Sequence, residues 1–294
     1  MATRLRMLLV LSPLACGGCG GVLDPAGPVA AADRDILIDA LVVMLAVVVP
    51  TLLAIPAFAW WFRAGNRRAR YRPDWAFSGR IELLVWSVPI LVVLFLGGMI
   101  WIGTHALDPR RPLPSSAPPL EVQVVSLDWK WLFLYPGQGI ASVDRLVLPA
   151  GVPVHFSLTS ASVFNVFFVP RLGSMIYTMN GMVTDLNLRA DHPGRFHGLS
   201  AHFSGDGFAD MGFDTIALPA AGFAAWTARA RRDGGTLDAR HYAVLAQPSR
   251  GAPVQIFGLV DPGLFGAIVH QRLPAAPGPD VGRPDARISP RSPH

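Results

Sequence analysis

Two long stretches of this chain contain no charged residue, and they constrain the fold more than any other feature. Residues 40–62 and 83–104 hold no Asp, Glu, Lys or Arg. As a helix with a rise of about 1.5 Å per residue, each stretch can cross the roughly 30 Å of hydrocarbon in a bilayer. We therefore predict two transmembrane helices, over residues 39–63 and 82–106. Pro56 and Pro89 lie inside them, and packed transmembrane helices tolerate such prolines.

Composition agrees with a membrane protein. Of the 294 residues, 51% are hydrophobic and only 15% are charged, which is too apolar for an ordinary soluble domain. The net charge of +5 does not indicate nucleic-acid binding, because the arginines form no stripe among aromatic residues.

The segment between the two helices, residues 64–81, fixes the expected topology. It carries five arginines, with a sixth at Arg63 directly before it, against Asp74 as its one acidic residue. Short basic loops stay on the cytoplasmic side of a membrane. We therefore expect a cytoplasmic loop, with both termini and the bulk domain in the periplasm.

The N-terminus has the plan of a bacterial lipoprotein signal, predicted over residues 1–18. Arg4 and Arg6 precede a short apolar run that is too short to span a bilayer, and small residues follow. Cysteines after small residues are lipidated in such signals. We favour Cys19 as the lipidated residue and keep Cys16 as the alternative, since Pro13 stands where the signal for Cys16 prefers Leu. A plain signal peptide with incidental cysteines stays open. Residues 19–38 then form a periplasmic N-terminal segment.

Beyond a proline-rich linker at 107–119, the hydrophobic period changes from helix to strand. Residues 120–124 alternate between apolar and polar, and further short apolar runs up to residue 217 are separated by Pro and Gly turns. Short strands with frequent turns over about 100 residues predict an antiparallel β-sandwich at 120–219. Helical spacing predicts a helical extension at 220–273, and the proline-rich tail at 274–294 is expected to be disordered.

Residues 163–212 resemble the copper-binding half of subunit II of the haem-copper oxidases. In that family a binuclear copper (CuA) centre is held by V-x-H-x-x-x-V-P-x-L-G and by C-x-E-x-C-x-x-x-H-x-x-M. This chain reads VFNVFFVPRLG and then SAHFSGDGFADM. The ligand positions are occupied by Asn165, Ser200, His202, Ser204, Phe208 and Met211, and only the methionine agrees with the family. Serine hydroxyls cannot replace the thiolates that such a centre needs. We expect no metal in this chain.

This loss of ligands resembles subunit II of the quinol oxidases of the cytochrome bo type. The resemblance covers about residues 20–270. It implies a cupredoxin-like Greek-key sandwich in a proton-pumping ubiquinol oxidase that reduces oxygen to water. Haems and copper would lie in subunit I, with subunits III and IV and membrane lipid as further partners and no cytochrome c. The location would be the bacterial inner membrane. The position of Cys19 close to Leu23-Asp24-Pro25 also fits these subunits.

Glu82 is a candidate for proton uptake, since it stands at the predicted cytoplasmic mouth of the second helix. As an alternative, it is an acid at a helix N-terminus that pairs with Arg80. In the resembling family, a glutamate at the matching place lies at the mouth of a proton path into subunit I. The resemblance therefore favours the proton-uptake role.

Two other functions are kept as alternatives. A subunit II fed by a soluble donor needs a binuclear copper site or an attached haem, but Gly20 follows the Cys16–Cys19 spacing where c-type haem attachment requires His. A membrane-anchored cupredoxin-like binding module without an oxidase partner is the second alternative. For Trp129 and Trp131, which occupy the place of an electron-entry patch in the family, we expect a structural role.

Overall fold

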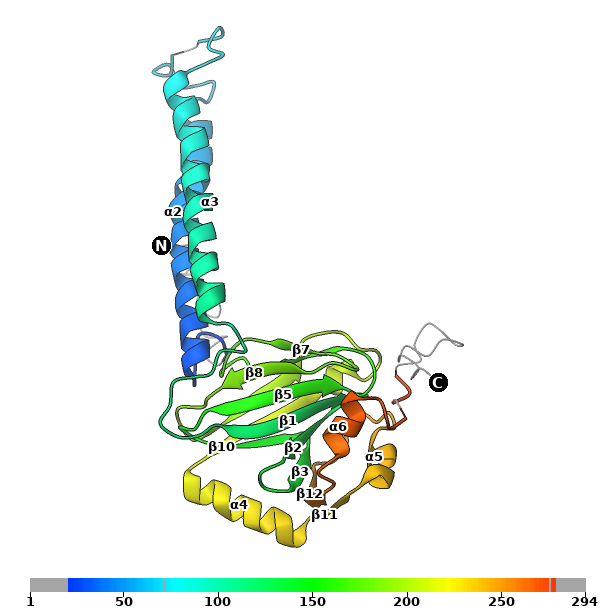
Figure 1. Cartoon of the computed structure of the whole chain (residues 1–294). Coiled ribbons are helices and arrows are strands. Elements are labelled where there is room, and N and C mark those ends of the chain that lie inside the picture. The colour runs from blue at the N-terminus through cyan, green and yellow to red at the C-terminus, as the bar shows by residue number, and fades with distance from the viewer. Residues whose placement is uncertain (1–20, 71, 275, 279–294) are drawn as a thin grey trace, which may run out of the picture. The chain divides into compact units, whose positions relative to one another are not determined.

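The computed structural model describes residues 21–70, 72–274 and 276–278. Cys16 and Cys19 lie outside these residues. The chain divides into two units: one comprises residues 1–33 and 109–294, and the other comprises residues 34–108 (Figure 1).

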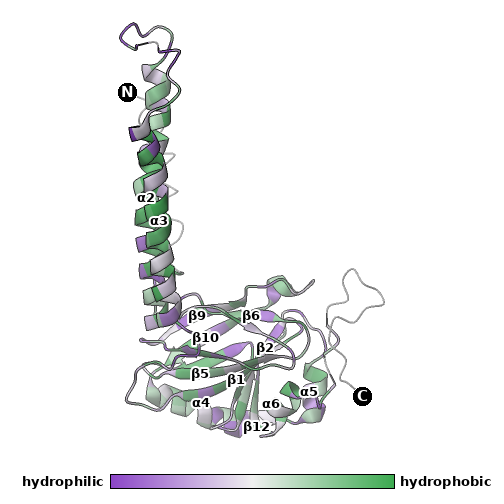
Figure 2. Ribbon diagram, turned by 45° about the horizontal axis from the view of Figure 1, so that its top comes forward, coloured by the Kyte–Doolittle hydropathy of each residue, from purple (hydrophilic) through white to green (hydrophobic). Residues whose placement is uncertain are grey.

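Two long helices make up the smaller unit, and the first of them starts in the larger one. Helix α2 covers Pro28–Trp61, and helix α3 covers Gly79–Ala106. Their most apolar windows have mean hydropathies of 2.7 and 2.5, and neither window contains a buried residue. Figure 2 shows the apolar colour along both helices. By length and composition both can cross a membrane. Helix α2 begins eleven residues before the predicted span, and α3 begins three residues before it.

The residues just before α2 and its first two turns are tied to strands and loops of the large unit. The Ala26 amide donates to the Arg171 carbonyl at 2.7 Å, and the Ser174 hydroxyl donates to the Asp33 carboxylate at 2.8 Å. Gly27 allows this close approach, because a Cβ there would lie 2.1 Å from the Arg189 carbonyl oxygen. This docking explains why the helix starts so early: tertiary contacts, not apolar periodicity, define its first turn.

Two packed sheets form the large unit and confirm the predicted β-sandwich. The first sheet has the order β11-β12-β3-β2-β1-β5-β8, and the second has the order β4-β10-β9-β6-β7. The strands of the first sheet are β1 (Leu120–Leu127), β2 (Lys130–Tyr135), β3 (Ile140–Val143), β5 (Val154–Ser160), β8 (Thr184–Leu188), β11 (Gly235–Leu237) and β12 (Gln255–Val260). The strands of the second are β4 (Arg145–Pro149), β6 (Asn165–Phe168), β7 (Ile176–Thr178), β9 (Gly194–Ser200) and β10 (Gly212–Leu218).

The expectation of purely antiparallel pairing is wrong for three pairs. Strand β1 runs parallel to β5, β4 runs parallel to β10, and β11 runs parallel to β12. Local turn signals reveal only hairpins between neighbours along the chain. Between β1 and β5 the chain passes through three other strands, one of them in the opposite sheet, so the direction of β5 depends on the tertiary path.

Aromatic rings fill the space between the sheets. Trp131 and Phe167 are fully buried and meet at 5.6 Å between centroids, and Phe213 stacks on Phe167 at 5.3 Å. Such pairs add to the stabilisation that burial provides. Trp131 is therefore a core residue, as expected for its structural role.

The C-terminal region is less helical than predicted. Helices α4 (Ala220–Asp233), α5 (Ala239–Leu245) and α6 (Leu264–Val269) are present, but β12 pairs with β3 and extends the first sheet. A strand of six residues that contains Gly258 gives too weak a period to be recognised from sequence. We call residues 234–278 the C-terminal arm.

The expectation of disorder from residue 274 onwards is wrong for the part of the tail that the structure describes. Ala276 is buried and its amide donates to the Ala161 carbonyl at 3.1 Å, while the Gly278 amide donates to Asp128 at 2.9 Å. The end of the arm is thus fixed to the sandwich by partners that are distant in sequence.

Candidate functional site

Four of the six positions that hold copper ligands in the resembling family come together where β6 begins and β9 ends. Asn165 is the first residue of β6, and Ser200 is the last residue of β9. Ser204 and Met211 lie in the loop that connects β9 to β10, around a short 3-10 helix at Phe208–Asp210. These four side chains are all buried.

The uncharged side chains of this cluster contact one another. The Ser200 hydroxyl donates to the Asn165 side-chain carbonyl at 3.2 Å, and the Ser204 hydroxyl contacts the Met211 sulfur at 4.0 Å. The Ser200 amide also donates to the Met211 carbonyl at 3.2 Å. Each hydroxyl that stands at a cysteine position is therefore engaged with a protein partner.

These donors do not fit the binuclear copper centre of the resembling family. An amide, two hydroxyls and one thioether supply no thiolate and no imidazole, and soft copper sites depend on both. Across the described residues, no group of three or more His, Cys, Asp or Glu side chains is placed to hold a metal ion. The cluster acts as a packed, hydrogen-bonded end of the sandwich.

At the other two positions, the backbone carbonyls accept hydrogen bonds from the cluster, His202 from the Ser200 hydroxyl at 3.3 Å and Phe208 from the Met211 amide at 3.1 Å, while the side chains make aromatic contacts. His202 stacks on Phe164, with ring centroids 4.3 Å apart, and Phe208 makes an edge contact with Phe203 at 5.6 Å. Next to the cluster, an open hollow of about 620 Å³ is lined by Ser200, Phe208 and Met211 together with residues of β10 and the arm. Asp144 and His197 also line it.

Trp129 and the C-terminal arm cover the loop on another side. The Trp129 ring nitrogen donates to the Ser204 carbonyl at 3.0 Å, and the Arg250 guanidinium lies 5.6 Å from the centre of the Trp129 ring. Arg250 also pairs with Asp206 at 3.2 Å. Gly207 permits this packing, since a Cβ there would lie 2.3 Å from the Trp129 ring. Sequence reasoning gave Arg250 no role; its partners are more than 40 residues away.

Three charged side chains flank the tryptophan pair in sequence or bond to its backbone: Asp128, Lys130 and Asp144. Lys130 is 2% exposed, and its ammonium donates to the Gln247 carbonyl and to the Ser249 hydroxyl, both at 2.6 Å. Asp128 accepts a hydrogen bond from Ser162 at 2.5 Å. The carboxylate of Asp144 accepts from the Trp131 amide at 2.7 Å.

Burial dominates the ionisation of this group. Burial raises the pKa of Asp144 to about 6, against the hydrogen bond from the Trp131 amide and the charge of Lys130, which lower it. Burial also lowers the pKa of Lys130, although the charges of Asp144 and Asp128 raise it. Both shifts disfavour the charged forms, so desolvation exceeds the mutual attraction. The sequence did not predict this buried charged group. Its one indication is that Lys130 is the chain's only lysine and lies between two tryptophans.

The Asp144 shift predicts a pH-dependent stability. Because the folded-state pKa lies above the value near 3.9 of an unfolded chain, the folded state binds more protons between these values, and stability falls as pH rises from about 4 through 6. We expect Asp144→Asn to raise the free energy of unfolding by about 1–2 kcal/mol at pH 8 and to change it little at pH 4. Thermal melting at both values checks this, with Asp210→Asn as an exposed control in the same hollow. An equal effect at both values would contradict the assignment.

Glu82 lies in the first turn of α3 and is exposed. The Trp86 ring nitrogen donates to its carboxylate at 3.4 Å. The ion pair with Arg80 that the alternative invoked is not among the ion pairs of the described residues. The proton-uptake role stays a prediction.

Comparison with known proteins finds close relatives along most of the chain. It is 46% identical over 266 residues to cytochrome bo(3) ubiquinol oxidase subunit 2 of Pseudomonas aeruginosa, covering 90% of this chain and 80% of that protein. It is 47% identical over 261 residues to ubiquinol oxidase subunit 2 of Acetobacter aceti, covering 88% and 85%.

Two further similarities are more local. The family model of the COX Aromatic Rich Motif matches residues 231–272, which include most of the C-terminal arm. Among solved structures, the periplasmic domain of subunit II of cytochrome oxidase of Bradyrhizobium japonicum aligns at 23% identity and a TM-score of 0.38, covering 40% of this chain and 96% of that one. From the identity to its full-length relatives, the chain belongs to the family of quinol oxidase subunit 2.

Proposed function

We propose that this chain is subunit II of a terminal oxidase that oxidises ubiquinol and reduces oxygen to water. The observation that carries the proposal is the buried, neutral cluster of Asn165, Ser200, Ser204 and Met211, in which hydroxyls replace the thiolates of an electron-entry site. Electrons would then enter the complex from a membrane quinol. The identity to relatives named ubiquinol oxidase subunit 2 supports the same donor.

In this proposal the chain is a structural and assembly subunit of an oxidoreductase complex. No histidine occurs between residues 40 and 104, so the uncharged stretches of the two predicted spans offer no imidazole to a haem, and the second span contains a single histidine, His105, in its last turn. Haems and copper would belong to a separate subunit I, with subunits III and IV completing the assembly. The two helices would anchor the chain in the bacterial inner membrane, with the sandwich in the periplasm.

The proposal is tested by purification of the chain after mild detergent extraction. We expect a haem- and copper-containing partner, and oxygen consumption with ubiquinol but none with reduced cytochrome c. Turnover with cytochrome c would favour an oxidase fed by a soluble donor. Purification of the chain alone, without haem, would favour a membrane-anchored binding module.

A lipid anchor at Cys19 is a further part of the proposal. Diacylation there would place the mature N-terminus on the periplasmic side, in agreement with the basic loop between the helices. Because two transmembrane helices hold a protein far more firmly than acyl chains, the protein should stay in the membrane without the anchor. Mass spectrometry of the mature N-terminus distinguishes a lipidated Cys19 from a lipidated Cys16 or an unmodified end.

We expect Glu82→Gln to slow ubiquinol-driven oxygen reduction by more than about twofold at equal haem content. A carboxylate at a channel mouth can pass protons and the isosteric amide cannot. Assembly should survive, because the side chain keeps its shape and is exposed. The matched control is Glu121→Gln, which changes the chain's only other glutamate, in β1. Turnover within about twofold of wild type would leave Glu82 as an acid at a helix end.

A further inference from the structure

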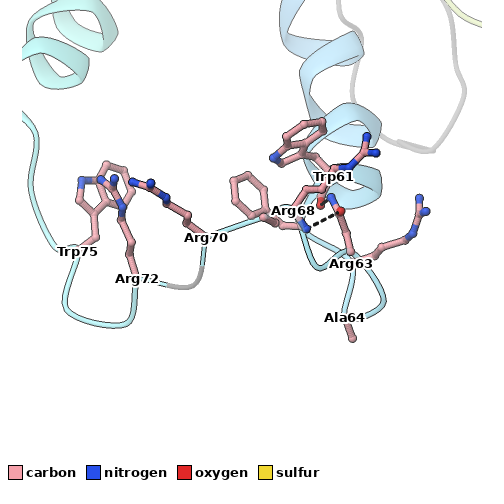
Figure 3. A pocket seen from close by; sticks show the side chains of 10 residues that line it. Trp61, Arg63, Ala64, Arg68, Arg70, Arg72 and Trp75 are labelled. Atoms are coloured by element: carbon pink, nitrogen blue, oxygen red, sulfur yellow. Dashed lines mark hydrogen bonds between the residues drawn. The ribbon is translucent and has the colours of Figure 1, made fainter.

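Described residues at the end of α2 and in the loop before α3 line a hollow of about 930 Å³. Its lining includes four arginine side chains and two tryptophans: Arg63, Arg68, Arg70, Arg72, Trp61 and Trp75. Figure 3 shows Trp61 and Arg68 near the end of α2, and Arg70, Arg72 and Trp75 farther along the loop. The hollow belongs entirely to the helical unit.

The positive charge of this hollow is not neutralised by the described part of the protein. Residues 63–80 contain six arginines and one aspartate, a formal charge of +5. None of the ion pairs of the described residues involves an arginine of this loop. Elsewhere in the described chain, arginines such as Arg171 and Arg195 hold carboxylates at 2.6 Å. The loop therefore offers guanidinium groups to an anion from outside the chain.

The shape of guanidinium groups favours phosphate. Arginine presents a planar fork of N–H donors that matches phosphate oxygens, and it holds phosphate more specifically than a point charge does. The side chains of Arg68, Arg70 and Arg72 are exposed, so their donors are accessible. Asn66 orders the turn from within, since its side-chain carbonyl accepts from the Arg68 amide at 3.1 Å.

The position of the hollow favours a lipid headgroup over free phosphate as its ligand. It lies directly at the end of α2, an apolar helix of 34 residues, and therefore at the level of the lipid headgroups if that helix spans the membrane. Trp61 and Trp75 have the amphipathic rings that settle at this interface. Basic clusters next to a transmembrane helix attract the anionic lipids of the cytoplasmic leaflet.

We propose that this hollow binds the phosphate headgroup of an anionic phospholipid, with Arg70 and Arg72 as the principal donors and Trp61 and Trp75 against the glycerol region. The inference depends on the membrane assignment of α2 and α3 and not on quinol oxidation. Binding is measured without turnover, so its failure and the failure of the proposed function are distinguishable.

The test measures lipid binding to the full-length chain in neutral detergent by native mass spectrometry. The two probes are dioleoylphosphatidylglycerol and dioleoylphosphatidylcholine. We expect wild type to prefer the anionic lipid, and we expect Arg70→Gln/Arg72→Gln to weaken that preference by about 25-fold, since each of the two cations near a membrane surface contributes roughly a factor of five. Arg70→Lys/Arg72→Lys should keep part of the preference, because the charge remains while the fork is lost.

The matched control is Arg229→Gln/Arg240→Gln, which removes the same charge from exposed positions in α4 and α5. It should leave lipid preference unchanged, and circular dichroism should show equal helix content in all variants. Unchanged preference in the Arg70/Arg72 glutamine variant, or an equal loss in the control, would overturn the site. Competition by millimolar inorganic phosphate would overturn the lipid as its ligand and identify free phosphate instead.

Discussion

A chain that carries the family's copper ligands is expected to form a purple binuclear copper centre, whereas the natural chain stays colourless when copper is added. The five substitutions are N165H, S200C, H202E, S204C and F208H. The reason is that the fold already places the two serines, which stand at the cysteine positions, next to two other ligand positions of the family, Asn165 and Met211. The Ser200 hydroxyl lies 3.2 Å from Asn165, and the Ser204 hydroxyl lies 4.0 Å from the Met211 sulfur, which is the one family ligand retained.

The control for this experiment keeps both serines and carries only N165H, H202E and F208H. Without thiolates it should give no purple absorption, because hydroxyls cannot delocalise the charge of the copper pair. Copper content and the visible spectrum are measured on full-length protein whose folding is verified by circular dichroism. A purple natural chain would refute the loss of the site. A folded five-substitution variant without copper would show that the loop geometry has diverged.

Lys130→Ala is expected to lower the free energy of unfolding of the sandwich by about 3 kcal/mol or more. The ammonium is buried beside Asp128 and Asp144, and its removal takes away the attraction between these carboxylates and a buried cation. It also deprives the Gln247 carbonyl and the Ser249 hydroxyl of their donor. The C-terminal arm should then detach and become sensitive to proteases near these two residues.

Urea unfolding and limited proteolysis of the full-length chain measure the two effects. The control is Arg240→Ala, which removes an exposed cation from helix α5 of the same arm. It should change stability by less than about 0.5 kcal/mol. An arm that resists proteolysis equally in the Lys130 variant and the control would show that other contacts, such as the pairing of β12 with β3, suffice to hold it.

The sequence alone shows that all copper ligands of the family except the methionine are missing from this chain. It does not show which partners the substituted residues contact in the folded domain. The residue types at the ligand positions already exclude thiolate ligation. That Ser200 donates to Asn165, and that Trp129 and Arg250 cover the loop, depends on partners 35 to 121 residues apart. No local pattern encodes such distances.

The membrane helices and most strands of the sandwich were determined by local sequence, because uncharged stretches and alternating runs have physical consequences within one element. The tertiary structure alone decided three other features. Strand β1 pairs in parallel with β5, β12 joins the first sheet, and Ala276 is buried instead of disordered. The physical reason is common to all three. Each feature is stabilised by burial and backbone hydrogen bonding against segments far away in the chain, and the residues of one local segment do not determine that free energy.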